Sequence, residues 1–222
     1  FNASLEIELL AVTTELSLVL DCDTPMIFKL VPSQRPDQVI KALTFDLVGG
    51  LEETHFADGH GNQCMRALMS KGASSLRVSF EGQQIAAAST SLGHFVPIQA
   101  LPVDVLPFLQ PSRYCEADQF LKITREVLSG TSPGYEQVAR ICSFVQNKFS
   151  YEPGSSRTPR SALDAMQDTA GVCRDFAHVS IAMLRSISIP ARYVVGYLGG
   201  LLPQDVHAWG EAYVGNRWVA FD

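Results

Sequence analysis

The sequence lacks several patterns that would each assign a class of protein. Its 17 Lys and Arg residues are outnumbered by 23 Asp and Glu, the formal net charge is −6, and no basic cluster occurs. Nucleic-acid binding needs clustered cations, so we expect no nucleic-acid partner. No apolar run is long enough to span a bilayer and no signal peptide is recognisable, which predicts no membrane partner and a cytoplasmic location.

The sequence also lacks paired-cysteine motifs and glycine-rich phosphate-binding loops. The five cysteines are odd in number and form no Cys-x-x-Cys, which disfavours a zinc ribbon or a disulfide framework and predicts reduced thiols. No glycine-rich phosphate-binding loop is present. We therefore expect no metal and no cofactor. As free cysteine is usually buried and inert, four of the five are interpreted as small core residues: Cys22, Cys64, Cys115 and Cys142.

The chain does have enough apolar residues for a packed core. Of its 222 residues 46 % are hydrophobic and 18 % are charged, which suits one large domain or two small ones. In the first half, short stretches alternate apolar and polar residues and are separated by turn signals such as residues 58–62. This pattern predicts an all-β sandwich domain over residues 1–100.

Proline punctuates residues 101–116, which we interpret as a linker. Beyond it, apolar residues recur at helical spacing, and residues 173–188 predict a long buried helix that Pro190 ends. Three strand-like stretches close the chain, at residues 191–197, 206–214 and 217–221. Residues 117–222 are therefore predicted as an α+β core, with helices packed on an antiparallel sheet.

Three residues at the boundaries of these elements carry reactive groups. Cys173 opens the long helix, where the helix dipole favours a thiolate and free backbone N–H groups can receive an oxyanion. Asp175 in the first turn suits the same dipole. His207 begins a strand and supplies the base that a thiol needs, and Asp222 can fix the tautomer of that imidazole. The order cysteine, histidine, acid predicts a catalytic triad for acyl transfer at an amide carbonyl.

Two further aromatic residues have a functional and a structural interpretation. Tyr151 is a candidate for the oxyanion site or the pocket, and Trp209 could shield an ion pair from water; both could equally be core residues. His178 is interpreted as structural, since five helical residues turn it away from Cys173. The same separation disfavours a metal site formed by Cys173, His178 and His207.

Four ordered motifs around these residues resemble the bacterial transglutaminase-like superfamily. They read GVCRDFAH at 171–178, IPARYV at 189–194, HAWGE at 207–211 and WVAFD at 218–222. The segments PSRYC at 111–115 and YEPG at 151–154 are also similar to the family, as is the N-terminal β-domain with its turn at 58–62. The resemblance covers nearly the whole chain.

The resemblance implies a papain-like transglutaminase core whose triad is Cys173, His207 and Asp222. It implies a transglutaminase, cysteine protease, deamidase or peptide-cleaving enzyme, with a peptide or protein amide as substrate. Family members continue past the acid with more strand, so the chain is expected to be truncated after Asp222. No pattern in the sequence indicates an oligomeric state.

Hydrolysis is favoured over cross-linking, because water needs no second binding site. The expected activity is therefore that of a cysteine hydrolase or transamidase, most simply a protease or amidase working through a thioester. One alternative is an acyl-CoA-dependent N-acyltransferase, which can use the same triad and would need a nucleotide pocket. The other is a catalytically inactive module that binds peptides, which an intact triad disfavours.

Overall fold

The computed structural model describes residues 7–36, 38–85, 93–155, 159–202 and 204–222. The chain folds as two compact units, Phe1–Ser89 (unit 1) and Thr90–Asp222 (unit 2).

Unit 1 consists of two three-stranded antiparallel sheets, in the orders β1-β6-β3 and β2-β5-β4. The strands are β1 (Ile7–Leu20), β2 (Thr24–Val31), β3 (Gln38–Val48), β4 (Gly50–Ala57), β5 (Gln63–Met69) and β6 (Gly72–Ile85). The central strands bury alternate side chains, Met65, Ala67 and Met69 on β5 and Leu76, Val78 and Phe80 on β6. This period-two burial is that of a sandwich with its core between the sheets.

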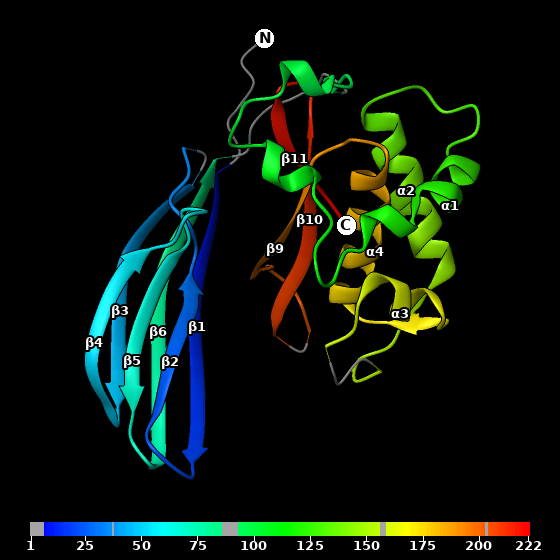
Figure 1. Ribbon diagram of the computed structural model, residues 1–222. Helices are drawn as coiled ribbons and strands as arrows, with labels where there is room; N and C mark the ends of the chain where they lie inside the picture. Colours follow the sequence, from blue (N-terminus) through cyan, green and yellow to red (C-terminus); the bar gives the residue numbers. More distant parts are fainter. Residues whose placement is uncertain (1–6, 37, 86–92, 156–158, 203) are drawn as a thin grey trace. The chain divides into compact units, whose positions relative to one another are not determined.

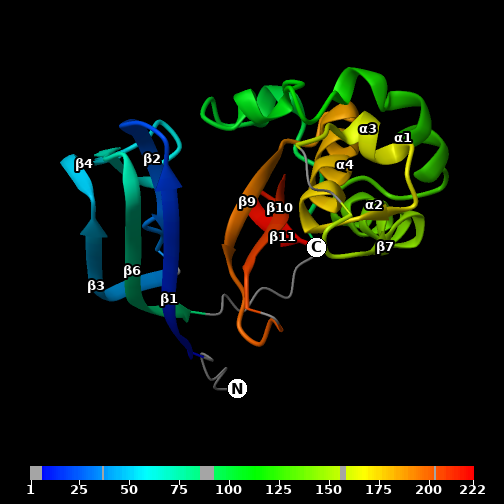
Figure 2. The same ribbon diagram turned by 90° about the horizontal axis from the view of Figure 1, so that it is seen from below.

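Unit 2 packs helices on one face of its own antiparallel sheet, in the order β11-β10-β9 (Figures 1 and 2). Its strands are β9 (Ala191–Tyr197), β10 (Val206–Val214) and β11 (Arg217–Phe221), with a short parallel pair of β7 (Ser150–Tyr151) and β8 (Ala170–Gly171). Its helices are α1 (Leu121–Val127), α2 (Tyr135–Lys148), α3 (Ala162–Met166) and α4 (Cys173–Ser186). The described residues also form short 3₁₀ turns, η1 (Ile98–Ala100), η2 (Leu106–Leu109) and η3 (Ala117–Gln119).

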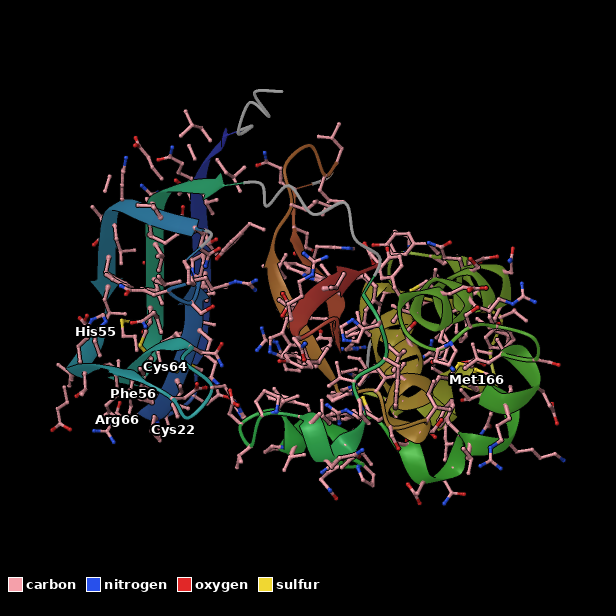
Figure 3. The ribbon with its side chains drawn as sticks, turned by 90° about the horizontal axis from the view of Figure 1, so that it is seen from above. Cys22, His55, Phe56, Cys64, Arg66 and Met166 are labelled. Atoms are coloured by element: carbon pink, nitrogen blue, oxygen red, sulfur yellow. The ribbon has the colours of Figure 1, made fainter. Side chains whose placement is uncertain are left out.

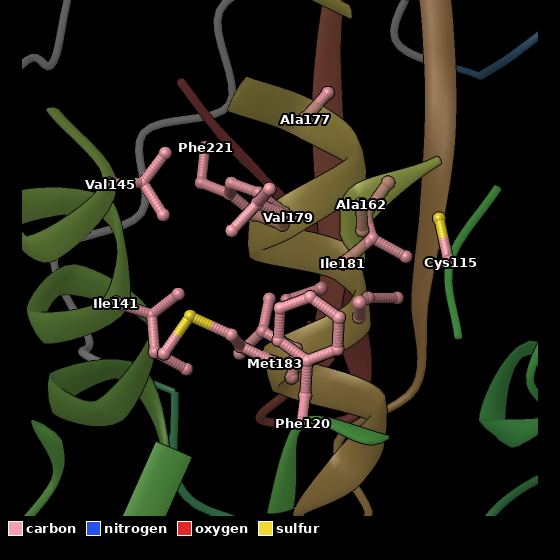
Figure 4. Packing of buried hydrophobic residues seen from close by; sticks show 14 of the residues in the cluster. Cys115, Phe120, Ile141, Val145, Ala162, Ala177, Val179, Ile181, Met183 and Phe221 are labelled. Carbon is pink, nitrogen blue, oxygen red and sulfur yellow. The ribbon is translucent and has the colours of Figure 1, made fainter. Parts of the chain in front are cut away.

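The core of unit 2 is built around α4. Val179, Ile181 and Met183 are fully buried, and α4 contacts β10 on one side and α2 on the other. Figure 4 shows α4 side chains meeting Ile141 and Val145 of α2 and Phe120, which precedes α1. A 14-residue helix buried this completely gives the sheet and its loops a rigid support.

The fold class predicted from the sequence is confirmed: a sandwich precedes an α+β core of the transglutaminase type. The division of the chain differs in detail, since residues 101–116 lie within unit 2 and not between the units. There Leu101 and Val105 are buried against Tyr213 of β10. Pro107 lies at the start of the 3₁₀ turn η2, which contacts β9 and α4 instead of extending as an exposed linker. Among the described helices, none has the length and apolar character needed to cross a membrane.

Candidate active site

Cys173 is the first residue of α4 and is half-buried. The preceding residue, Val172, is extended with φ −113° and ψ 170°, so the chain leaves β8 and turns directly into the helix. The backbone N–H groups of Asp175 and Phe176 both donate to the Val172 carbonyl. The thiol therefore stands at the positive end of a long buried helix, as the sequence predicts.

A buried ion pair holds this helix start in place. The Asp175 carboxylate is fully buried and accepts a bond from the Val172 N–H at 2.9 Å. Arg160 donates through Nε and Nη2 to the two carboxylate oxygens at 3.1 Å each, and through Nη2 to the Ala170 carbonyl at 2.9 Å. One guanidinium thus ties β8 to the first turn of α4, on both sides of Cys173.

No pattern in the sequence indicates this role of Arg160. It lies 15 residues before Asp175, and one arginine in a proline-containing loop carries no recognisable spacing. Asp175 was predicted to act on the helix dipole, and the structure adds a specific partner to it. The hydrogen bond with Asp175 is also the main cause that raises the pKa of Arg160, against the opposing effect of its own burial.

Tyr151 is positioned beside Cys173 by the parallel pair of short strands. Tyr151 lies opposite Gly171, and the Glu152 N–H donates to the Gly171 carbonyl at 3.0 Å. Its ring packs edge-on against Phe176 of α4, with the centroids 6.3 Å apart, and 57 % of the residue stays exposed. Partial burial first, and then the negative charges of Cys173, Asp205 and Asp222, raise the pKa of the Tyr151 phenol.

His207 and Asp222 are brought together by the register of β10 and β11. Phe221 pairs with Gly210, so Asp222, the next residue, comes level with Trp209, two residues along β10 from His207. An Asp222 carboxylate oxygen lies 2.6 Å from Nε2 of His207. The Asp222 carbonyl accepts a bond from Gln146 of α2 at 3.2 Å, which holds the residue in position. The hydrogen bond predicted between these two side chains is present.

Trp209 lies alongside the His207 ring. The two rings are nearly parallel, with an interplanar angle of 20° and centroids 6.1 Å apart. The indole lies over Gly196 of β9, where an added Cβ would come within 2.6 Å of it. Gly196 is therefore required for Trp209 to lie flat on the sheet next to His207.

His178 points into a stack of aromatic rings. It is buried on α4, parallel to the Tyr114 ring at 5.5 Å, and it contacts the Tyr193 ring at 5.1 Å. Burial lowers its pKa, against a hydrogen bond with the backbone of Arg160 that raises it. The neutral ring fits the structural role expected from the sequence. Among the residues that the structure describes, no three His, Cys, Asp or Glu side chains converge to hold a metal ion.

The other cysteines differ from Cys173 in their surroundings. Burial raises the pKa of the Cys115 thiol to about 11 and that of Cys142 to about 12. Cys64 is buried in unit 1. The interpretation of Cys22 as a core residue is wrong, because it lies exposed in the bend between β1 and β2. Its strand ends there, so no second sheet covers the thiol.

Comparison with known proteins agrees with this arrangement. A family model for the transglutaminase-like superfamily matches residues 121–222. A solved structure from Cytophaga hutchinsonii, described as a candidate cysteine protease, is 30 % identical with a TM-score of 0.88, covering 98 % of this chain and 78 % of that one. At the level of the family, the fold of this chain is that of the papain-like cysteine enzymes. The chain belongs to the transglutaminase-like superfamily.

Further relatives share parts of this likeness. The periplasmic domain of TgpA from Pseudomonas aeruginosa shares the fold, at 17 % identity and a TM-score of 0.52 over 96 % of this chain and 69 % of that one. An uncharacterized protein of Mycobacterium leprae, ML0607, is 32 % identical over half of this chain and 42 % of its own length. Bacillus subtilis YebA is 26 % identical over 40 % of this chain and 15 % of its own. The chain therefore spans less than half the length of the curated relatives that it matches.

Proposed function

We propose that this protein is a cysteine peptidase or amidase that transfers the acyl group of an amide to Cys173 and then to water. The observation that carries the proposal is the 2.6 Å contact of His207 with Asp222, on a sheet that packs against the helix begun by Cys173. A thiol at the start of a helix, with an imidazole and a carboxylate on two neighbouring strands, supplies the components of a thiol–imidazole–carboxylate triad.

In the proposed reaction, a proton passes from the Cys173 thiol to His207. Since Asp222 engages Nε2, the nitrogen that receives this proton is Nδ1. The thiolate adds to the amide carbonyl carbon, and the carbonyl oxygen becomes an oxyanion. His207 then returns the proton to the leaving amine as the C–N bond breaks, and a thioester remains. Water adds to the thioester, with His207 again taking the proton, and releases the acid.

Tyr151 is proposed to stabilise the oxyanion. Its raised pKa keeps the phenol protonated at neutral pH, so the hydroxyl can donate a hydrogen bond. The exposed ring is held at the helix start by the pairing of Tyr151 with Gly171. A donor that is fixed by the backbone in this way loses little freedom when the charge develops on the substrate oxygen.

The substrate is proposed to be a peptide with a bulky apolar residue beside the cleaved amide. On the face of the sheet that meets α4, Tyr193 and Val195 of β9 and Val206 of β10 are more than a third exposed. Tyr193 reaches α4 through its contact with His178. Burial first, and then the charge of Cys173, raises the pKa of Tyr193 to about 12, which keeps its phenol neutral. An apolar side chain can displace water from this surface.

The test is to trap the acyl-enzyme. The protein is incubated with a blocked Leu–Tyr peptide that carries an amidomethylcoumarin leaving group, and intact-mass and peptide mass spectrometry locate the adduct. We expect one acyl group on Cys173, and loss of turnover by about 10³-fold or more in Cys173→Ala. Cys142→Ala is the matched control and should retain activity. Acylation elsewhere, or turnover unchanged in Cys173→Ala, contradicts the proposal.

Two further experiments test the role of Asp222 and the fate of the thioester. Asp222→Asn keeps the size of the side chain and removes its charge, so we expect turnover to fall by about 10²-fold, less than in a serine enzyme, because a thiol depends less on its base. Adding glycine methyl ester during turnover measures how the thioester partitions between water and an amine. Acid as the main product supports hydrolysis, whereas amide as the main product assigns transamidation.

A further inference from the structure

Unit 1 contains a cavity that the proposed reaction does not use. It measures about 160 Å³ and lies between the two sheets of the sandwich. Both layers contribute to its wall, with Phe28 and Leu30 from β2, Met65 from β5, Ile40 and Phe45 from β3 and Val78 from β6. Apolar cavities of about 150 Å³ in proteins stay dry and take up a single aromatic ring, so this one has room for a small ligand.

Breaks in strand register surround the cavity. The pairing of β2 shifts between Phe28 and Val31, that of β3 between Lys41 and Thr44, and that of β4 between Leu51 and Thr54. In the β3 bulge Ala42 has φ +50°, a strained value for a residue with a side chain. Bulges bend strands and are frequent beside binding sites. Here three register shifts occur in strands that contribute to the cavity wall.

The side chains that line the cavity are incompletely covered. Phe28, Leu30, Ile40 and Phe45 all point toward the interior and are only partly buried, although β5 and β6 bury their own side chains. Leaving apolar surface of this kind exposed costs stabilisation that a closed sandwich would gain. A ligand that fills the cavity would recover it.

The lining also selects the chemistry of the ligand. None of the described lining residues is Lys, Arg, Asp or Glu, and the polar side chains are Gln34, His55 and Gln63, with the thiol of Cys64. Figure 3 shows His55 and Cys64 on the neighbouring strands β4 and β5. His55 already pairs with Glu53. A charged ligand would lose its hydration without gaining a counter-ion, whereas the two glutamine amides can bond a neutral polar end.

We propose that unit 1 binds a small neutral molecule with an apolar body of about one aromatic ring and a single hydrogen-bonding end. The ring fills the space between Phe28, Ile40 and Val78, and the polar end reaches Gln34 or Gln63. The proposal does not depend on the reaction at Cys173, because all the described lining residues belong to unit 1.

The experiment uses three probes that differ in the end group alone: benzyl alcohol, toluene and benzoate. The whole protein is labelled with ¹³C at its five methionine methyl groups. Met65 lines the cavity, while Met166 and Met183 of unit 2 serve as internal references. We expect a saturable shift of the Met65 signal alone, with benzyl alcohol binding most tightly and benzoate at least about tenfold more weakly.

Two matched variants test whether the probe binds in the cavity or on the surface of unit 1. Leu43 lines the cavity and is 41 % exposed, so Leu43→Trp can fill the opening without disturbing the buried core. Leu51 of β4 is similarly exposed and does not line the cavity. We expect Leu43→Trp to weaken benzyl alcohol binding at least about tenfold and Leu51→Trp to change it less than about twofold. No saturable Met65 shift, equal binding of benzoate, or equal effects of the two variants overturns the proposal.

Discussion

The two units of this protein are packed in opposite ways. In unit 2, α4 is enclosed by α2 and by the sheet, and Val179, Ile181 and Met183 have no exposed surface. In unit 1, two thin sheets enclose a cavity, and inward-pointing residues such as Phe28 and Ile40 are only partly buried. The enclosed helix positions reactive groups at its end, while the open sandwich leaves space for a ligand.

The difference follows from what each unit can bury. A helix with apolar residues on most sides is covered all round, and each large side chain buried in this way contributes about 1.5–3 kcal/mol. A sheet of three strands buries one face, and its edge strands bury less than its centre. The enclosed core of unit 2 surrounds a buried charge near Cys173, the Asp175 carboxylate.

The largest expected contrast is in cysteine reactivity, measured in a Cys173→Ser background with iodoacetamide at pH 8. Cys22 is exposed and should be labelled fastest of the four remaining cysteines. Burial raises the pKa of Cys142 from 9.0 to about 12, so its thiolate is about a thousandfold rarer and its labelling at least that much slower. Cys64, which lines the unit 1 cavity, should be labelled between these two, since a less enclosed unit opens more readily.

The control is labelling in denaturant, where the remaining cysteines should react at similar rates. Peptide mass spectrometry assigns each rate to its residue. If Cys142 is labelled as fast as Cys64 in the native protein, unit 2 is no more tightly closed than unit 1, and the comparison fails.

The second contrast concerns the buried ion pair at the start of α4. Asp175→Ala leaves Arg160 without its buried partner and the Val172 N–H without an acceptor, so we expect unit 2 to lose about 3–5 kcal/mol of stability. Asp168 also pairs with Arg160, but its side chain is 57 % exposed. Asp168→Ala should therefore cost less than about 1 kcal/mol.

Urea unfolding followed by separate probes in the two units measures both effects, and unit 1 should keep its own transition in both variants. Arg160→Lys keeps the charge but cannot bond both carboxylate oxygens and the Ala170 carbonyl in the same way. It should fold and should slow the acylation of Cys173. Equal destabilisation by Asp168→Ala and Asp175→Ala would show that burial is not what makes the pair important.

Much of unit 2 could be predicted, because the apolar residues of its helices and strands recur at the spacing that each type of element requires. The strands expected at 191–197, 206–214 and 217–221 are confirmed as β9, β10 and β11, and the helix expected from Cys173 is confirmed as α4. The His207–Asp222 contact was also predictable, since two adjacent strands joined by a two-residue turn place their opposite ends side by side.

What could not be predicted depends on contacts between distant segments. Arg160 acts through Asp175, and no local spacing relates a loop residue to a helix 15 positions later. The prolines at 101–116 suggest a linker, yet Leu101 and Val105 are buried against Tyr213, a contact that exists only once the sheet is formed. The strands that line the cavity in unit 1 likewise carry three register shifts, which alternation of polar and apolar residues does not reveal.

The smallest expected effect is a pH dependence of stability confined to unit 2. His178 is enclosed by Tyr114 and Tyr193, its burial lowers its pKa below 6.5, and Arg174 adds to this while Asp175 and Glu116 oppose it. Between the lowered pKa and 6.5, the unfolded chain binds more protons than the folded one. Stability should therefore be full above pH 6.5 and fall as the pH is lowered through that window, with a slope of at most about 1.4 kcal/mol per pH unit.

Urea unfolding of unit 2 between pH 5 and 8 measures this slope. In His178→Gln the slope in that window should shrink, because the side chain no longer titrates; His94→Gln, at an exposed position of the same unit, should leave it unchanged. Unit 1, whose His55 is exposed and paired with Glu53, provides a second reference within the same molecule. If the wild type and His178→Gln have the same slope, the buried imidazole does not control the pH response, and the carboxylates around the helix start must be tested in its place.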